Sequence, residues 1–112
     1  ELPLVPRDML IADAIGIMSS KGFGCVLVIG DTGDLAGIIT DGDLRRHLTP
    51  DMPAQKAETV MTRNPTTITP GTLLAEALEI VDSRRHAALI VVEENKPVGL
   101  VHVLDLLRAG AA

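Results

Sequence analysis

The sequence predicts an α/β (α+β) fold of two β-α-β-β-α repeats, related by a pseudo-twofold axis and packed sheet to sheet. The first observation behind this prediction is a heptad that occurs twice. Gly37-Ile38-Ile39-Thr40-Asp41-Gly42-Asp43 returns 62 residues later as Gly99-Leu100-Val101-His102-Val103-Leu104-Asp105. The second is that the apolar run 26–29 returns as 89–92, at a spacing of 63. The change in spacing indicates one residue lost in the turn between run and heptad, where changes of length are tolerated.

The first repeat, residues 1–48, is predicted from apolar periodicity and turn residues. Asp8 suits the N-cap of a helix that runs to Lys21, where Gly22-Phe23-Gly24 stops it. A continuous apolar run at 25–29 predicts a strand buried on both faces. The rest of the repeat is predicted to be an extended lead-in at 1–7, a turn at 30–34, a returning strand at 35–39 and a short helix at 44–48.

The second repeat, residues 60–112, is predicted to follow the same order after a linker at 49–59. The linker is predicted because Pro50 and Pro53 stand among polar residues. The predicted elements of the second repeat are an extended stretch at 66–69, a helix starting at 70–72, strands at 89–92 and 98–101, a turn at 93–96 and a helix at 106–109. Because each repeat is too small to be stable alone, the two are expected to bury their apolar strands together.

Composition excludes several classes of function. The 112 residues are 46% hydrophobic with one Phe and no Tyr or Trp, so the core must be aliphatic. A net charge of -5 argues against a nucleic-acid binder, and no apolar run approaches the roughly 20 residues of a membrane span. Cys25 is the only cysteine and cannot form an internal disulfide. We expect a cytoplasmic protein, and the start at Glu1 without Met predicts a domain cut from a longer chain.

Three features together resemble a known family. They are the two heptads, an alanine in the first helix of each repeat (Ala14 and Ala77) and the run Val60-Met61-Thr62-Arg63-Asn64-Pro65. This pattern, which covers nearly the whole chain, resembles a tandem pair of cystathionine-β-synthase-type (CBS) domains. The resemblance implies a module that senses ligands such as adenosine nucleotides in clefts between its halves. In such modules Thr or Ser and Asp of the heptad typically hold the phosphate and the ribose hydroxyls.

A narrower resemblance concerns residues 37–46 and the C-terminal Asp105-Leu106-Leu107-Arg108-Ala109-Gly110. They are similar to arabinose-5-phosphate isomerases, in which a sugar isomerase domain precedes the CBS pair. Those enzymes convert ribulose 5-phosphate to arabinose 5-phosphate for the synthesis of Kdo, a component of lipopolysaccharide or capsule. Nothing here matches the isomerase domain, so this chain is expected to be non-catalytic. The resemblance and the logic of the pathway imply CMP-Kdo as a feedback effector, with AMP or ATP as the alternative.

Thr40 and Asp43 form the leading candidate site for ligand contact. A hydroxyl can donate to a phosphate, and a carboxylate can accept from ribose hydroxyls. The alternative is that Asp43 only caps the helix that follows. Arg45 and Arg46 could reach the anionic end of a ligand or could form a solvated helix face.

The second heptad departs from the first because His102 replaces the threonine. A histidine could still donate to a phosphate, or become cationic near it, but a structural role is an equal alternative. Asp105 keeps the carboxylate. The two sites are therefore predicted to differ, with ligand binding favoured at the first.

Basic and polar residues outside the heptads complete the set of candidate ligand contacts. Arg84 and Arg85 end the first helix of the second repeat, where Arg suits phosphate binding by its planar fork or simply complements the helix dipole. Thr62, Arg63 and Asn64 could close over a ligand or could belong to a solvated linker. No spacing of His47 or His86 with other side chains predicts a metal or catalytic site.

Two hypotheses from different classes follow. The first is a regulatory module whose ligand biases an attached isomerase domain through different affinities for two arrangements. The second is a structural module that forms a homo-oligomer, since CBS pairs commonly associate into flat dimers through their helices. The Thr40 and Asp43 pair favours the first hypothesis, because a purely structural module would not need it.

Overall fold

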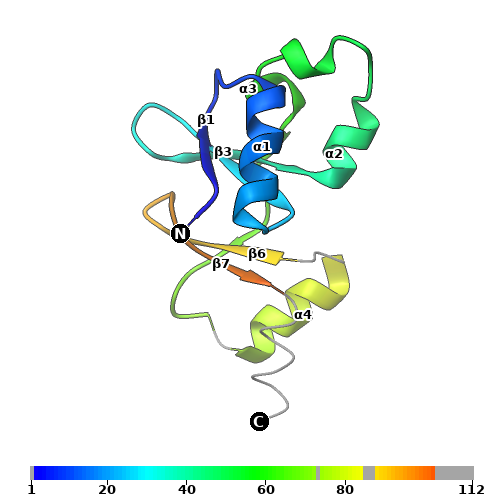
Figure 1. Ribbon diagram of the computed structural model, residues 1–112. Helices are drawn as coiled ribbons and strands as arrows, with labels where there is room; N and C mark the ends of the chain where they lie inside the picture. Colours follow the sequence, from blue (N-terminus) through cyan, green and yellow to red (C-terminus); the bar gives the residue numbers. More distant parts are fainter. Residues whose placement is uncertain (1, 73, 85–87, 103–112) are drawn as a thin grey trace. The chain divides into compact units, whose positions relative to one another are not determined.

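The structure, a computed structural model, describes residues 2–72, 74–84 and 88–102 and divides into two compact units, residues 1–65 and 66–112. Within the described residues, unit 1 contains a four-stranded sheet and unit 2 a three-stranded sheet, which confirms the predicted α/β class (Figure 1). Unit 1 comprises β1 (Leu4–Pro6), α1 (Ile11–Lys21), β2 (Cys25–Ile29), β3 (Leu35–Thr40), α2 (Asp41–Arg46), the 3-10 helix η1 (Met52–Ala54), α3 (Ala57–Val60) and β4 (Thr62–Arg63). Unit 2 comprises β5 (Thr67–Ile68), α4 (Leu74–Arg84), β6 (Ala88–Glu93) and β7 (Lys96–His102). The packing of one sheet against the other stays a prediction.

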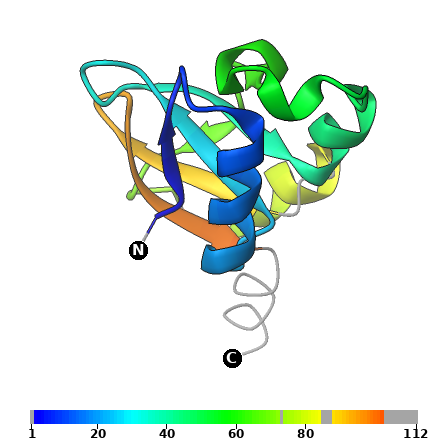
Figure 2. The same cartoon turned by 45° about the horizontal axis from the view of Figure 1, so that its top comes forward.

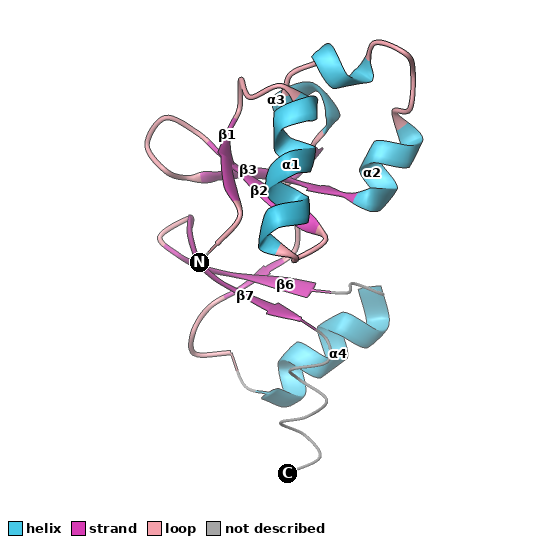
Figure 3. Cartoon of the chain, viewed as in Figure 1, coloured by secondary structure: helices cyan, strands magenta, loops and turns pink. Residues whose placement is uncertain are grey.

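Strand β2 lies inside the sheet of unit 1, whose order is β1-β2-β3-β4 (Figure 3). It pairs parallel with β1 and antiparallel with β3. Four of its five residues are buried, as the continuous apolar run predicted for a strand covered on both faces. In this register Thr40, the last residue of β3, lies opposite Cys25, the first residue of β2.

Helix α1 lies against β2 in unit 1 (Figure 2) and begins two residues later than predicted. Asp8 is not its N-cap; that position belongs to Leu10, which makes no side-chain cap and is 42% exposed. The reason is that the backbone before α1 pairs with a distant segment, through a bridge between Leu10 and Lys56. The predicted end is confirmed, since Gly22 adopts φ 72° and its N–H binds the carbonyl of Met18.

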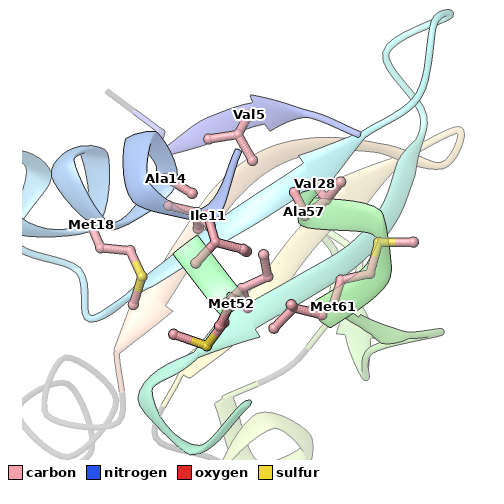
Figure 4. Close-up of a cluster of buried hydrophobic side chains, with 11 residues drawn as sticks. Val5, Ile11, Ala14, Met18, Val28, Met52, Ala57 and Met61 are labelled. Atoms are coloured by element: carbon pink, nitrogen blue, oxygen red, sulfur yellow. The ribbon is translucent and has the colours of Figure 1, made fainter. Parts of the chain in front are cut away.

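The segment expected to be a linker, residues 49–59, contributes to the core of unit 1. It contains η1 and the start of α3, and Met52 and Ala57 are 4% and 0% exposed. Figure 4 shows both side chains gathered with those of Ile11 and Met61, the latter just beyond α3. Unit 1 accordingly extends to Pro65, past the boundary predicted for the first repeat. Four-residue helices such as α3 depend on such tertiary packing because isolated short helices are unstable in water.

Unit 2 repeats the strand register of unit 1. Val28 lies opposite Gly37 in unit 1, and Val91 lies opposite Gly99 in unit 2, with an irregularity one residue further in both strands. The two paired residues are nine positions apart in unit 1 and eight in unit 2, as the change in spacing predicted. Buried or partly buried apolar side chains of α4 and the sheet form its core, namely those of Ile68, Ala77, Leu78, Ile80, Leu89 and Val101.

Candidate functional site

The first heptad bends the chain from a strand into a helix. Strand β3 ends at Thr40, which has an extended backbone (φ −115°, ψ 172°) and serves as the N-cap of α2. The hydroxyl of Thr40 accepts from the backbone N–H of Asp43 at 3.3 Å, and the backbone N–H of Thr40 donates to Oδ2 of Asp43 at 2.8 Å. These reciprocal bonds form a capping box, with Asp at the position where Glu or Gln is usual. Asp43 therefore does help to cap α2, which was the alternative role predicted for it.

The carboxylate of Asp43 also binds two groups outside the capping box. Residue Asp43 is only 2% exposed. Its Oδ1 accepts from the hydroxyl of Thr62 at 2.5 Å and from the guanidinium of Arg46, and its Oδ2 accepts the hydroxyl of Thr40 at 3.0 Å. A buried charge is stable when it is paired and hydrogen-bonded, which is the case here. Asp43 thus joins β3, α2 and β4.

The pKa of Asp43 reflects competition between burial and these contacts. Burial raises the pKa of the carboxyl, but hydrogen bonds from Thr62 and Thr40 and the nearby charge of Arg46 outweigh burial and hold it below its ordinary value. The carboxylate is therefore ionised at neutral pH and can accept hydrogen bonds only. Any ligand group that contacts Asp43 must be a donor, such as a sugar hydroxyl.

The free energy of unfolding is expected to depend on pH through Asp43. Its pKa is lowered in the folded chain and returns to about 3.9 on unfolding, so its stabilisation is complete above that value. The stabilisation is lost as the pH falls through the lower, folded-state pKa. Asp43→Asn should therefore flatten the loss of stability as the pH falls below about 4, measured by urea unfolding. Asp51→Asn is the comparison: the pKa of Asp51 is lowered too, but its carboxylate is exposed and its contacts are screened by solvent, so this variant should flatten the loss less than Asp43→Asn. Equal slopes in wild type and Asp43→Asn would contradict the prediction.

The structure brings together three of the predicted contact residues, Thr40, Asp43 and Thr62. Arg46 joins them although its side chain is 64% exposed, so it is both a partner of Asp43 and part of a solvated face. The signal for this contact was the i, i+3 spacing of Asp43 and Arg46, which places both side chains on one side of a helix. Arg63 lies next to Thr62 in β4, pairs with Gly37 and is exposed.

The other predicted contact residues belong to unit 2. His102 is the exposed last residue of β7 and lies opposite Ala88. This pair is the counterpart of the pair of Thr40 and Cys25 in unit 1. The structure thus confirms that His102 and Thr40 occupy equivalent register positions. Arg84 is the last residue of α4. Arg85 and Asp105 lie outside the described residues.

A hollow of about 530 Å³ in unit 1 lies away from this cluster. It lies where β1 and β2 end, whereas Thr40 faces the start of β2. Two of the residues that line the hollow, Arg7 and Glu58, form an ion pair at 3.4 Å, and both side chains are partly exposed. Its lining consists of Leu4, Val5, Pro6, Arg7, Asp8, Ile29, Gly30, Asp31 and Glu58, none of which is a predicted contact residue.

Among the residues that the structure describes, no three or more His, Cys, Asp or Glu side chains are grouped so that they could hold a metal ion. No helix in that part of the chain combines the length and the apolarity needed to cross a bilayer.

Comparison with known proteins relates nearly the whole sequence to one family and to longer relatives. The family model described as "CBS domain" matches residues 1–53 and 57–112. An uncharacterized protein of Rickettsia prowazekii is 37% identical over 100% of this chain and 35% of its own length. The arabinose 5-phosphate isomerases KdsD of Yersinia pestis and Pseudomonas aeruginosa are 37% and 40% identical over 98% and 97% of this chain, and 34% of each relative. The chain therefore spans about a third of the length of these curated relatives.

Solved structures agree with the fold. A CBS-domain containing protein from Agrobacterium tumefaciens has a TM-score of 0.87 at 23% identity, covering 98% of this chain and 84% of that chain. CBSX2 in complex with AMP has a TM-score of 0.84 at 23% identity, covering 98% and 87%. The cytosolic domain of the Mg²⁺ channel MgtE in complex with ATP has a TM-score of 0.83 at 20% identity, covering 96% and 44%. At sequence identities of 20% to 23%, the similarity of these structures shows the fold alone.

Proposed function

Since this chain belongs to the CBS domain family, we propose that it is a non-catalytic regulatory module that binds a nucleotide-type effector at Thr40 and Asp43. The observation that carries the proposal is the buried, ionised carboxylate of Asp43, which lies beside a threonine hydroxyl and the guanidinium of Arg46. Two proteins of the same fold were solved with AMP and with ATP, which supports a nucleotide as the class of ligand.

The chemistry of the cluster suits the two ends of a nucleotide. The carboxylate of Asp43 accepts from ribose hydroxyls, and the fork of Arg46, most of which is exposed, can donate to phosphate oxygens. The hydroxyl of Thr40 can donate to a phosphate only by giving up its present bond to Asp43. Apart from Thr62, whose hydroxyl already occupies Asp43, the remaining predicted contacts stay part of the proposal as ligand contacts; they are Arg63, Arg84, Arg85, His102 and Asp105.

We further propose that the module regulates a D-arabinose 5-phosphate isomerase and that an isomerase domain belongs to the full-length protein. Supporting this are the two KdsD relatives, of which this chain matches about a third. The effector would then be CMP-Kdo by the logic of the Kdo pathway, with AMP or ATP as the alternative.

Thermal melting of the 112-residue chain with AMP, ADP, ATP, CMP and CMP-Kdo tests the proposal. A ligand at about 100 times its dissociation constant should add about 2.7 kcal/mol to the unfolding free energy, a shift of several degrees. The ligand-induced shift should disappear in Asp43→Asn and persist in Asp51→Asn, each measured against the melting temperature of that variant alone.

The pattern of shifts separates the alternatives. A shift with CMP-Kdo and CMP alone supports the Kdo pathway, whereas a shift with adenosine nucleotides supports an energy-type sensor and weakens the link to the isomerase. No shift with any compound contradicts nucleotide binding. In that case the structural hypothesis becomes the better one, and light scattering should then show a stable homo-oligomer.

A further inference from the structure

We propose that the Thr62 hydroxyl is an internal competitor for the ligand, holding the position on Asp43 that a ligand hydroxyl takes. Binding would then exchange one hydroxyl for the other and release strand β4 from Asp43. This inference rests on the proposed function, because it says how the same site accepts its ligand.

The chain itself already occupies the Asp43 carboxylate. A carboxylate offers about four acceptor positions. In this structure Oδ2 accepts the backbone N–H and the hydroxyl of Thr40, and Oδ1 accepts the hydroxyl of Thr62 and the guanidinium of Arg46. Four donors from the chain itself therefore fill the carboxylate, and a ligand hydroxyl must displace one of them.

Chemistry indicates which donor leaves. The bond from the backbone N–H of Thr40 is one half of the capping box that starts α2, and the Thr40 hydroxyl accepts the other half while it donates to Oδ2. Losing either bond from Thr40 would therefore cost local structure. Arg46 carries the positive charge that an anionic ligand needs nearby. Thr62 is exposed, neutral and 19 residues away in sequence, and its hydroxyl is the same donor group as a ribose hydroxyl. Exchange at Thr62 preserves both the charge and the number of hydrogen bonds at Asp43.

The strand that carries Thr62 has few other anchors to the sheet. Strand β4 has two residues and pairs with β3 only through Gly37↔Arg63 and Ile38↔Thr62. Besides this pairing and the burial of Met61 just before the strand, β4 is held by the bond from Thr62 to Asp43. Its loss should allow β4 to separate from β3 more often.

Strand β4 is connected to the segment that precedes α1. It follows α3, whose first residue Ala57 donates its N–H to the carbonyl of Met9 at 2.7 Å, and Glu58 donates likewise to Arg7 at 3.0 Å. A ligand at Asp43 could thus alter the chain at residues 7–9 through β4 and α3. This provides a route within unit 1 from the site to the segment before α1.

Titration calorimetry with AMP, ATP, CMP and CMP-Kdo tests the exchange on Thr62→Val, which keeps the shape and removes the hydroxyl. For each nucleotide that the wild type binds, Thr62→Val should lower the dissociation constant about fivefold, because one competing hydrogen bond is gone. Thr62→Ser keeps the hydroxyl and should stay close to wild type. The matched control is Thr49→Val, which removes a 2.7 Å bond from Thr49 to the exposed Asp51 and should leave affinity unchanged.

Hydrogen exchange supplies a second readout on the wild-type chain. Saturation with the bound nucleotide should speed exchange of the backbone amides at residues 61–64, about threefold or more, as β4 is released. Weaker binding by Thr62→Val would overturn the proposal and make Thr62 a direct ligand contact. Unchanged affinity, or slower exchange at 61–64 on binding, would overturn the exchange while leaving the proposed function intact. A wild type that binds none of the four nucleotides would overturn the proposed function and the exchange with it.

Discussion

Replacing Asp43 by alanine is expected to lower the unfolding free energy of unit 1 by about 3 kcal/mol. The substitution removes four hydrogen bonds at once, including the side-chain half of the capping box and the contact with Arg46. The other half is kept, because the backbone N–H of residue 43 can still donate to the Thr40 hydroxyl. Hydrogen bonds to a charged group contribute more than neutral ones. Arg46 and Thr62 are exposed enough to find water instead, which keeps the loss below that of a fully buried network.

Urea unfolding can isolate this effect in unit 1 through Cys25. The thiol is buried in β2, and burial together with the nearby charge of Asp41 raises its pKa to about 11. It should therefore react with a thiol reagent only when β2 is exposed, while circular dichroism follows the whole chain. The labelling midpoint should move to lower urea in Asp43→Ala and stay in place in Asp51→Ala, where the carboxylate is exposed. A loss below about 1 kcal/mol would mean that water replaces the carboxylate at little cost.

The duplicated sequence was sufficient to predict the fold class and most strands. The shift in spacing from 63 to 62 placed the length change in a turn, and the pairs Val28↔Gly37 and Val91↔Gly99 confirm it. A repeat is informative because each copy tests the interpretation of the other. A single buried run could equally have been a helix, as periodicity alone does not separate the two.

Tertiary contacts decided the elements that the sequence did not predict. Residues 52–60 form η1 and α3 although Pro50 and Pro53 favoured a linker, because Met52 and Ala57 fill space in the core. The backbone of Leu10 pairs with Lys56, which delays the start of α1. Such pairings depend on residues over 40 positions apart, and local capping rules do not include them.

The candidate site was predicted in part. The heptad correctly placed Thr40 at the end of a strand. The helix predicted at 44–48 instead begins at Asp41, because Thr40 is its N-cap, and Asp43 lies within its first turn. The spacing of the heptad could not show that hydrogen-bond donors of the chain itself occupy the acceptor positions of the Asp43 carboxylate. The contact from Thr62 crosses 19 residues of sequence and follows from the pairing of β4 with β3.

Replacing Gly37 by alanine is expected to destabilise unit 1 by about 2 to 3 kcal/mol. A Cβ at this position would lie 2.7 Å from both the carbonyl oxygen of Thr62 and Sδ of Met61, and 2.9 Å from Cγ of Met61. The methionine side chain could move aside, but the Thr62 carbonyl belongs to the backbone of β4. The strand would therefore have to shift away from β3, which also weakens the bond from Thr62 to Asp43.

The duplication provides the matched control, Gly99→Ala. Among the described residues, a Cβ there would meet only Val91, at 3.5 and 3.6 Å, which is ordinary van der Waals contact. This variant should unfold within about 0.5 kcal/mol of wild type, because alanine also restricts the unfolded chain. Urea unfolding followed by Cys25 labelling and circular dichroism compares the two variants. Equal losses would contradict the explanation, since the glycine would then be required by the heptad itself; a loss in Gly37→Ala alone would show that β4 imposes it.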